Sequence, residues 1–177
     1  VFMSGVLLPT CAIVFSILLT MIYFSKERVN LIENKYYNVM IISILIDSIL
    51  ASTLQFICFG GVTDVELVLI KILNKVDFSI LIIYSTALFL YNLIITVKMD
   101  ENKIAKLTNY ALVIDVIAVI VLTFLKVELI QDGQNYSITG SSAYCTFGIC
   151  GMYIINSVFL LLFNLKKLDK RHIPMFM

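Results

Sequence analysis

The sequence predicts an all-α, polytopic transmembrane bundle of five helical spans plus the start of a sixth, with its N-terminus outside the cell. Three observations support this class. Of the 177 residues, 60% are hydrophobic and 14% are charged, whereas soluble domains have roughly 45–50% apolar and about 25% charged residues. The mean hydropathy is +1.00. The charged residues also gather in short segments that separate long uncharged runs.

The clearest uncharged run is 78–97, FSILIIYSTALFLYNLIITV, which lies between Asp77 and Lys98. A helix rises 1.5 Å per residue, so a run of this length makes a helix of about 30 Å, the thickness of the hydrocarbon core of a bilayer. A helix can cross lipid because its backbone hydrogen bonds are satisfied within the segment. We therefore predict a span here and expect the other spans to be arranged around it.

Similar runs predict the remaining spans. The five spans are expected at 2–24, 37–60, 78–97, 107–125 and 143–165, with a sixth beginning near 173. The segment 66–77 is amphipathic and either lies at the membrane interface or extends the third span. The chain begins with Val1 and ends in an apolar run. We therefore expect residues 1–177 to be a single membrane domain, cut from a longer protein.

The loop between the fourth and fifth spans is polar, with Asp132-Gly133 and Gly140 as turn signals. Residues 127–130 and 136–139 have a pattern that is compatible with a small hairpin around Asp132-Gly133.

The distribution of Lys and Arg predicts the orientation of the bundle. Ten of these residues follow the first, third and fifth spans: Lys26, Arg28, Lys35, Lys98, Lys103, Lys106, Lys166, Lys167, Lys170 and Arg171. The other side has three: Lys71, Lys75 and Lys126. Positively charged loops stay in the cytoplasm. The first, third and fifth spans are therefore expected to run from outside to inside.

Two carboxylates, Asp47 and Asp115, are expected near the middle of their spans and at similar depth, because both spans run in the same direction. Inserting a carboxylate at the centre of a bilayer costs roughly 2.5–3.5 kcal/mol of free energy. No Lys or Arg lies within the uncharged runs of the spans to compensate this charge. Each is therefore protonated, hydrogen-bonded or next to a wet cavity. The functional alternative is a proton, ion or ligand site, and the structural one is a neutral Asp that holds helices together.

The same two interpretations, a binding site or contacts that hold helices together, apply to other polar residues in the spans. A small, polar stripe on the second span ends at Gln55, and the third and fifth spans contribute Asn92 and Asn156. Such stripes face the interior of a bundle, where they hold helices together, or line a pocket. The candidate ligand-binding set is Asp47, Gln55, Asn92, Asp115 and Asn156.

The sequence predicts no catalytic or metal-binding residue in this fragment. The four cysteines lack the close spacing and the histidines of a zinc site, although a Cys58–Cys145 disulfide is geometrically possible. The only histidine, His172, lies in a basic tail. The net charge of +1 gives no field that would attract nucleic acid.

Three segments resemble a known family. Residues 23–35, YFSKERVNLIENK, resemble the first cytoplasmic loop of a group of bacterial multi-span sensor histidine kinases, where a YFSK-[KE]-R-[IV] run and ENK join the first two helices. The outer loop around Tyr136 and Gly140 is similar to a stretch that leads into the next helix in those proteins. The tail 166–174, KKLDKRHIP, is similar to their entry into a further span.

The resemblance implies a membrane-embedded sensing domain of a sensor histidine kinase, a multi-pass protein of the cell membrane. It implies that a signal passes to a cytoplasmic kinase module beyond Met177, which would use ATP and Mg²⁺, whereas no cofactor is expected in this fragment. It also implies a homodimer and a response regulator as partners, besides the lipid bilayer. The alternatives are a secondary transporter fragment with Asp47 and Asp115 as coupling carboxylates, and an assembly subunit.

Overall fold

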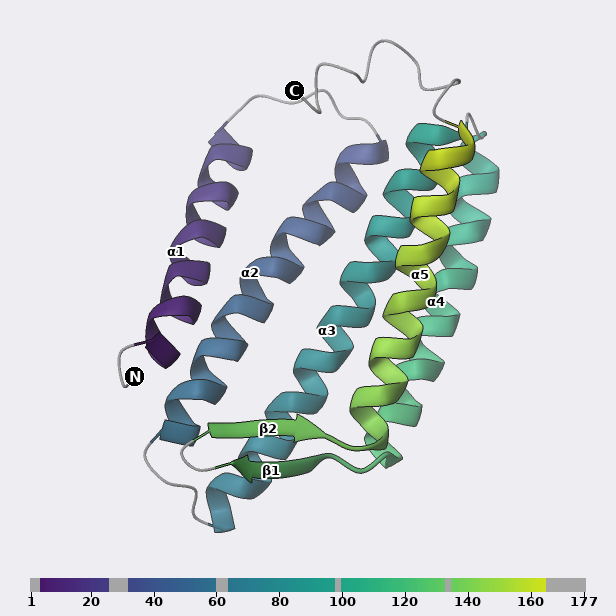
Figure 1. Cartoon of the computed structure of the whole chain (residues 1–177). Coiled ribbons are helices and arrows are strands. Elements are labelled where there is room, and N and C mark those ends of the chain that lie inside the picture. Colours follow the sequence, from purple (N-terminus) through teal and green to yellow (C-terminus); the bar gives the residue numbers. More distant parts are fainter. Residues whose placement is uncertain (1–3, 26–31, 60–63, 98–99, 133–134, 165–177) are drawn as a thin grey trace.

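The computed structural model describes residues 4–25, 32–59, 64–97, 100–132 and 135–164, and these form five helices and a hairpin (Figure 1). The elements are α1 (Ser4–Ser25), α2 (Ile32–Phe59), α3 (Asp64–Thr96), α4 (Glu101–Phe124), β1 (Glu128–Asp132), β2 (Asn135–Thr139) and α5 (Ser141–Asn164). Each of the five predicted spans falls on one of these helices. The predicted start of a sixth span, near residue 173, lies outside the described residues.

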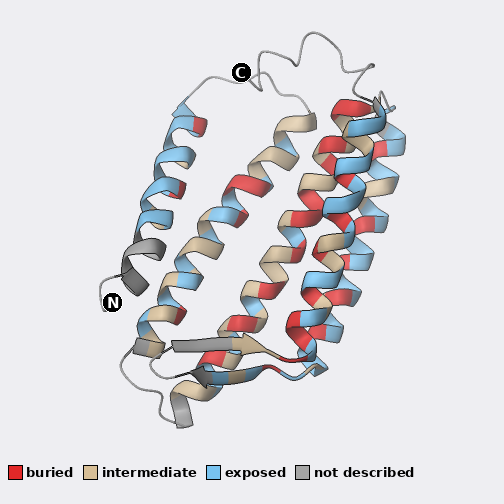
Figure 2. Ribbon diagram, in the orientation of Figure 1, coloured by how far each residue is buried: buried red, intermediate tan, exposed pale blue. Residues whose placement is uncertain are grey.

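Helix α3 is the centre of the bundle. It packs against α2, α4 and α5, while α1 lies at one edge beside α2 (Figure 1). Among the four helices with the length and composition of a span, α3 has the largest buried share, which Figure 2 shows as its many red turns. The expectation that the chain is arranged around the run 78–97 is thus confirmed.

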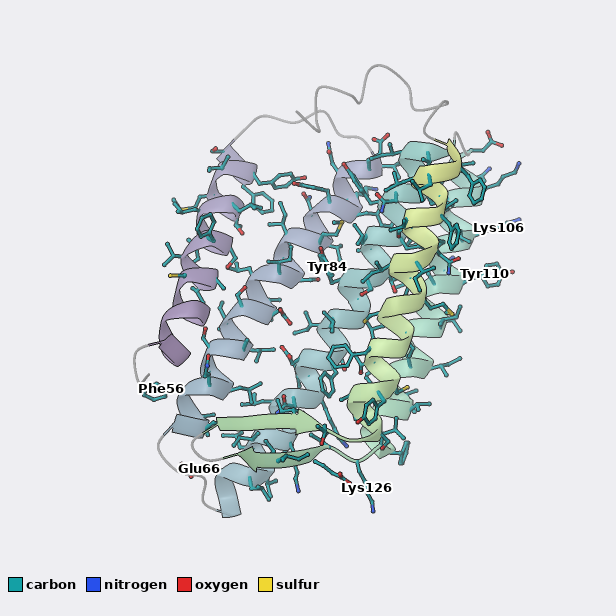
Figure 3. All side chains as sticks on the ribbon, in the orientation of Figure 1. Phe56, Glu66, Tyr84, Lys106, Tyr110 and Lys126 are labelled. Carbon is teal, nitrogen blue, oxygen red and sulfur yellow. The ribbon has the colours of Figure 1, made fainter. Side chains whose placement is uncertain are left out.

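Burial in this bundle differs from that in a soluble protein, although part of its interior is apolar. Large apolar side chains are exposed, such as Phe56 (78%) and Phe124 (83%), and Phe56 and Tyr110 point away from the bundle in Figure 3. Small polar side chains are buried, with Ser142 and Thr146 both at 0% exposure. Polar residues between helices and apolar residues around them are the arrangement that lipid favours, because lipid gives apolar groups no reason to bury.

Four helices are long and apolar enough to cross a membrane. The qualifying stretches are Ile32–Cys58, Glu66–Thr96, Asn102–Phe124 and Ser141–Phe163. In α1 the apolar stretch that the described side chains cover, Cys11–Ser25, is shorter. The helical class with several helices able to span a membrane is therefore shown, while a count of five spans and an outside N-terminus stay predictions.

The third helix begins earlier than predicted. Its boundary was expected at Asp77, but α3 runs unbroken from Asp64, so the alternative in which 66–77 extends the third span is confirmed. One of its polar residues, Lys75, binds a neighbouring helix. The Nζ of Lys75 donates a hydrogen bond of 2.6 Å to the carbonyl oxygen of Thr123, at the C-terminal end of α4, where backbone carbonyls have no partner within their own helix.

We expect Lys75→Met to weaken the bundle by about 0.3–1 kcal/mol, since it removes a cation from the C-terminal end of a helix. Lys71→Met is the matched control, because Lys71 lies one turn away and makes no hydrogen bond within the described residues. Unfolding in mixed detergent micelles at low and high salt measures both variants. Equal effects of the two substitutions would rule out the contact between Lys75 and α4.

The predicted hairpin is present, with strands one or two residues from their expected bounds. Strands β1 and β2 are antiparallel, and Glu128 pairs with Thr139. The hairpin lies across one end of the bundle (Figure 1). Val127 and Ile138 pack on a core cluster formed by α3, α4 and α5, so the apolar positions next to and within the strands hold the hairpin against the helices.

A positive φ angle at Gly140 turns the chain from β2 into α5. Its φ is 109°, a conformation that favours glycine. The amide of Ser142 donates to the carbonyl oxygen of Lys126 at 3.2 Å. The two ends of the loop that carries the hairpin are thus bound to each other at the start of α5.

Candidate intramembrane polar site

Asp115 is buried where three helices meet. It is 5% exposed, and its Oδ1 accepts a hydrogen bond of 2.9 Å from Thr86 Oγ1 on α3 and one of 3.5 Å from Tyr153 OH on α5. Its neighbours one turn away on α4, Ala111 and Ala118, are both buried. Small residues at these positions let helices approach closely, so that hydroxyl groups of α3 and α5 reach the carboxyl group.

Other polar groups continue the interface between α3 and α5. Ser85 on α3, whose hydroxyl donates to the carbonyl oxygen of Leu81 at 2.8 Å, and Cys150 on α5 are both at most 5% exposed. The hydroxyl oxygen of Ser157, which is 3% exposed, has no hydrogen-bond partner among the described residues. The rings of Phe89 and Tyr153 lie 5.7 Å apart between their centroids, which fixes the position of the tyrosine that binds Asp115.

A second carboxyl group faces Asp47. It belongs to Asp77 on α3, whose carboxyl group interacts electrostatically with that of Asp47. One oxygen of Asp77, Oδ1, is buried without a hydrogen-bond partner. On the same helix, Asn74 is 0% exposed, and its Oδ1 likewise has no partner. Two acidic side chains thus face each other between α2 and α3, and α3 also carries a buried amide oxygen without a hydrogen-bond partner.

Aromatic side chains pack in another part of the interface between α2 and α3. The ring centroids of Tyr23 and Tyr37 lie 4.7 Å apart, and those of Tyr37 and Tyr91 lie 5.6 Å apart. These three rings join α1, α2 and α3. Tyr84 extends from α3 into the space next to α2 (Figure 3). Each such aromatic pair contributes about 0.5–1.5 kcal/mol beyond its buried area, and together they fix the three helices relative to one another.

A shallow groove of about 270 Å³ lies between α1 and α2. Its lining is Ala12, Phe15, Ser16, Leu19, Ile41, Ile44 and Ser48. Both serine hydroxyls donate to backbone carbonyls of their own helices, Ser16 to Ile13 at 3.0 Å and Ser48 to Ile44 at 2.8 Å. The groove therefore presents no free hydrogen-bond donor from these serines to a ligand.

The structure distributes the five predicted ligand-binding residues over separate places. Asp47 and Asp115 each have partners of their own, Asn92 is buried on α3, and Gln55 is half-buried on α2. Asn156 is exposed on α5, and its Nδ2 donates to the carbonyl oxygen of Met152 at 2.8 Å. The interior position predicted for Asn156 is instead occupied by its neighbour Ser157, because one residue turns a helix by about 100°.

Sequence reasoning missed Asp77, Thr86 and Tyr153. Asp77 was treated as the boundary of a span, although a signal for its role was available. Helices α2 and α3 are antiparallel neighbours. Asp47 lies 12 residues before the end of α2 at Phe59, and Asp77 lies 13 residues after the start of α3 at Asp64, so the two residues are expected side by side. Thr86 and Tyr153 are common residues in a span, and no sequence pattern distinguishes them as partners of Asp115.

The cysteines are all in the reduced form. Cys58 and Cys145 are half-buried free thiols, Cys11 is exposed and Cys150 is buried. Within the described residues, no group of three or more His, Cys, Asp or Glu side chains is placed to hold a metal ion. The side-chain groups available between the helices are carboxyl, hydroxyl, thiol, amide and phenol groups.

These groups can bind a proton, a small cation or a polar ligand inside the bundle, and in doing so they change how the helices are joined. Comparisons of the chain with models of protein families, with curated proteins and with solved structures find no match.

Proposed function

We propose that this chain is the membrane-embedded, signal-sensing input domain of a sensor histidine kinase, which relays its signal to a cytoplasmic kinase module beyond Met177. The observation that carries the proposal is the bond network of Asp115. It links α5, the last described helix, to the centre of the bundle through Thr86 and Tyr153. The resemblance of residues 23–35 to the first loop of such kinases gives the family.

The direction of the relay follows from the arrangement of the helices. α1, α3 and α5 end at one end of the bundle, and α2 and α4 begin there (Figure 1). The first turns of α2 and α4, together with the segments that connect or follow the helices at this end, contain ten of the 13 Lys and Arg residues of the chain, which favours the cytoplasm for this end. In this orientation α5 runs toward the cytoplasm and passes its displacement to a dimeric kinase.

The signal itself is small or lies in the membrane. The described segment outside the helices at the opposite end is a hairpin of two five-residue strands, too little mass for a separate ligand-binding domain. The stimulus is therefore a ligand that binds among the helices or at the hairpin, or a property of the bilayer. A change at Asp115 that weakens its bond to Tyr153 frees α5 to shift, which is the kind of bistable contact a switch requires.

The test uses the full-length protein in lipid nanodiscs with radiolabelled ATP and Mg²⁺. We expect acid-labile phosphohistidine to form, and Tyr153→Phe to change the basal autophosphorylation rate about three- to tenfold, since it removes the hydroxyl that binds Asp115. Tyr144→Phe is the matched control, because Tyr144 lies on the same helix and is 73% exposed. Absence of ATP-dependent phosphorylation, or equal rates for both variants, contradicts the proposal.

The second candidate function is secondary transport, and the depth of the two predicted carboxylates favours it. Asp47 follows the start of α2 by 15 residues (32 to 47), and Asp115 follows the start of α4 by 14 (101 to 115). The two helices run in the same direction, so both carboxyl groups lie near mid-membrane. Proton uptake into liposomes that contain the full-length protein, lost in Asp47→Asn and Asp115→Asn, would establish transport.

A further inference from the structure

We propose that two copies of this chain associate in the membrane through α5, with their Asn156 side chains hydrogen-bonded to each other across a twofold axis. The partner of this helix is thus a second copy of the chain. The interface goes beyond the sensor role and does not depend on it, because it is argued from the side of α5 that faces lipid and not from the bonds of Asp115.

Asn156 is a polar side chain that faces lipid near the middle of a span. It is exposed on α5, whose exposed turns are pale blue in Figure 2. The centre of the apolar stretch Ser141–Phe163, the mean of 141 and 163, is residue 152. The Nδ2 of Asn156 donates to the carbonyl oxygen of Met152 at 2.8 Å. This bond turns the amide group toward the centre of the span and away from the water beyond the C-terminal end of α5.

The amide group of Asn156 retains unused hydrogen-bonding capacity. A primary amide has two N–H donors and an oxygen with two lone pairs, and the bond to Met152 uses one donor. Within the part of the chain that the structure describes, the side chain makes no other hydrogen bond. Lipid chains offer neither donors nor acceptors, so an unpaired polar group is costly among them. The second donor and Oδ1 therefore need a partner that the described residues do not provide.

A second copy of the chain provides both missing partners. The same distribution of Lys and Arg orients both copies in the same direction, so the twofold axis that relates them is parallel to the membrane normal. Residues near such an axis meet the same residue of the other copy. An amide is complementary to itself, because the N–H of each Asn156 donates to Oδ1 of the other. Asn side chains hold transmembrane helices together through bonds of this kind.

The residues around Asn156 on this side of α5 are suited to a second helix. Two helices that cross at about 20° face each other at positions that are alternately four and three residues apart. With Asn156 at the contact, these positions are Met152, Asn156, Phe159 and Phe163, which we call the α5 seam. Its three apolar members are all exposed. The rings of Phe159 and Phe163 are stacked, with centroids 6.0 Å apart, and a flexible Met side chain fills gaps between helices.

Two other lipid-facing surfaces of the bundle lack a polar group at this depth. The exposed side chains of α1 between residues 14 and 22, and those of α4 between residues 112 and 121, are all apolar. Asn109 on α4 is also exposed, but it lies one turn from the exposed Lys106, which points away from the bundle in Figure 3. Lysines at this end mark the cytoplasmic surface, so the amide of Asn109 lies close to water. Asn109 is therefore a matched control for Asn156.

The experiment measures disulfide cross-linking between copies of the full-length protein in native membranes treated with copper phenanthroline. Met152→Cys places a thiol on the α5 seam. Ile154→Cys is the matched control, because Ile154 is also exposed but lies about 200° around the helix from Met152. The yield of the protein with only its four native cysteines is the background. We expect Met152→Cys to give at least about fivefold more cross-linked dimer than Ile154→Cys, since only one side of α5 meets the other copy.

A further substitution in the Met152→Cys protein tests the amide. Asn156→Leu should lower the cross-linked fraction about tenfold, the scale of a strong polar contact between transmembrane helices. The fold of each copy should be unchanged, because Asn156 bonds only to its own helix. Asn156→Gln keeps an amide and should keep most of the cross-link, and Asn109→Leu should keep all of it.

Several results would overturn the interface. These are equal yields from Met152→Cys and Ile154→Cys, a yield that Asn156→Leu leaves unchanged, and a loss in Asn109→Leu as large as that in Asn156→Leu. Cross-linking of Met152→Cys to a different protein would assign the seam to another partner, and no cross-link at all would assign it to lipid. The measurement does not involve ATP, so a failure of the kinase proposal leaves its outcome unaffected.

Discussion

Gly140→Ala is expected to destabilise the bundle by about 1–3 kcal/mol, the cost of holding a residue with a Cβ in a sparsely populated conformation. The φ of Gly140 is 109°, and an added Cβ would lie 2.6 Å from the carbonyl oxygen of Lys126 and 3.1 Å from the amide nitrogen of Glu128. Both atoms are backbone atoms of the segment that enters β1, so neither can move away without breaking the closure between the hairpin and α5.

Gly148→Ala is the matched control for this prediction. Gly148 lies in α5, and an added Cβ would meet nothing within 4 Å. Alanine is favoured over glycine inside a helix by about 0.8–1.0 kcal/mol, so this variant should be neutral or slightly more stable. Reversible unfolding of both variants in mixed micelles measures the difference. A loss of stability in Gly148→Ala as large as that in Gly140→Ala would show that the positive φ is not the cause.

The helices were predictable because length and apolarity are local properties. A run such as 107–125 predicts a helix wherever it packs, and α4 is found over Glu101–Phe124. The start of α3 was left open between an interfacial segment and an extension of the span for the opposite reason. Lys75 and Asp77 were interpreted as charges that a span excludes, but their environment is set by α4 and α2, since Lys75 binds the end of one helix and Asp77 faces a side chain of the other.

For the candidate sites, the sequence predicted only the residues that are unusual in a membrane span and not their partners. Asp47 and Asp115 stand out because a carboxyl group in a span is costly. Their partners depend on which helices become neighbours. The chain order gives α4 after α3, but it does not indicate that α5 packs against α3 and brings Tyr153 to Asp115. Whether Asn156 or Ser157 faces the interior depends on a rotation of α5 by one residue. The sequence around both residues is apolar and does not indicate which rotation occurs.

Thr86→Val is expected to cost about 1–3 kcal/mol, because it removes the donor at 2.9 Å and leaves a buried carboxyl group with one long hydrogen bond. Valine has nearly the same shape as threonine, so packing between α3 and α4 is preserved. The matched control is Thr53→Val. Thr53 is exposed on α2, and its hydroxyl donates to the carbonyl oxygen of Ile49 on its own helix, so its loss should change stability by less than about 0.5 kcal/mol.

A double-mutant cycle with Asp115→Asn separates the bond from the burial of charge. Interhelical hydrogen bonds in membranes average about 0.6 kcal/mol and reach about 1.7, so coupling between Thr86 and Asp115 in that range indicates an ordinary bond between neutral groups. Coupling well above it indicates that Asp115 is ionised and that Thr86 stabilises the charge, because hydrogen bonds to charged groups are the stronger ones. Zero coupling contradicts the contact. An ionised Asp115 would make the junction of α3, α4 and α5 responsive to any cation or proton that reaches it, and a neutral one would make it a fixed link between these helices.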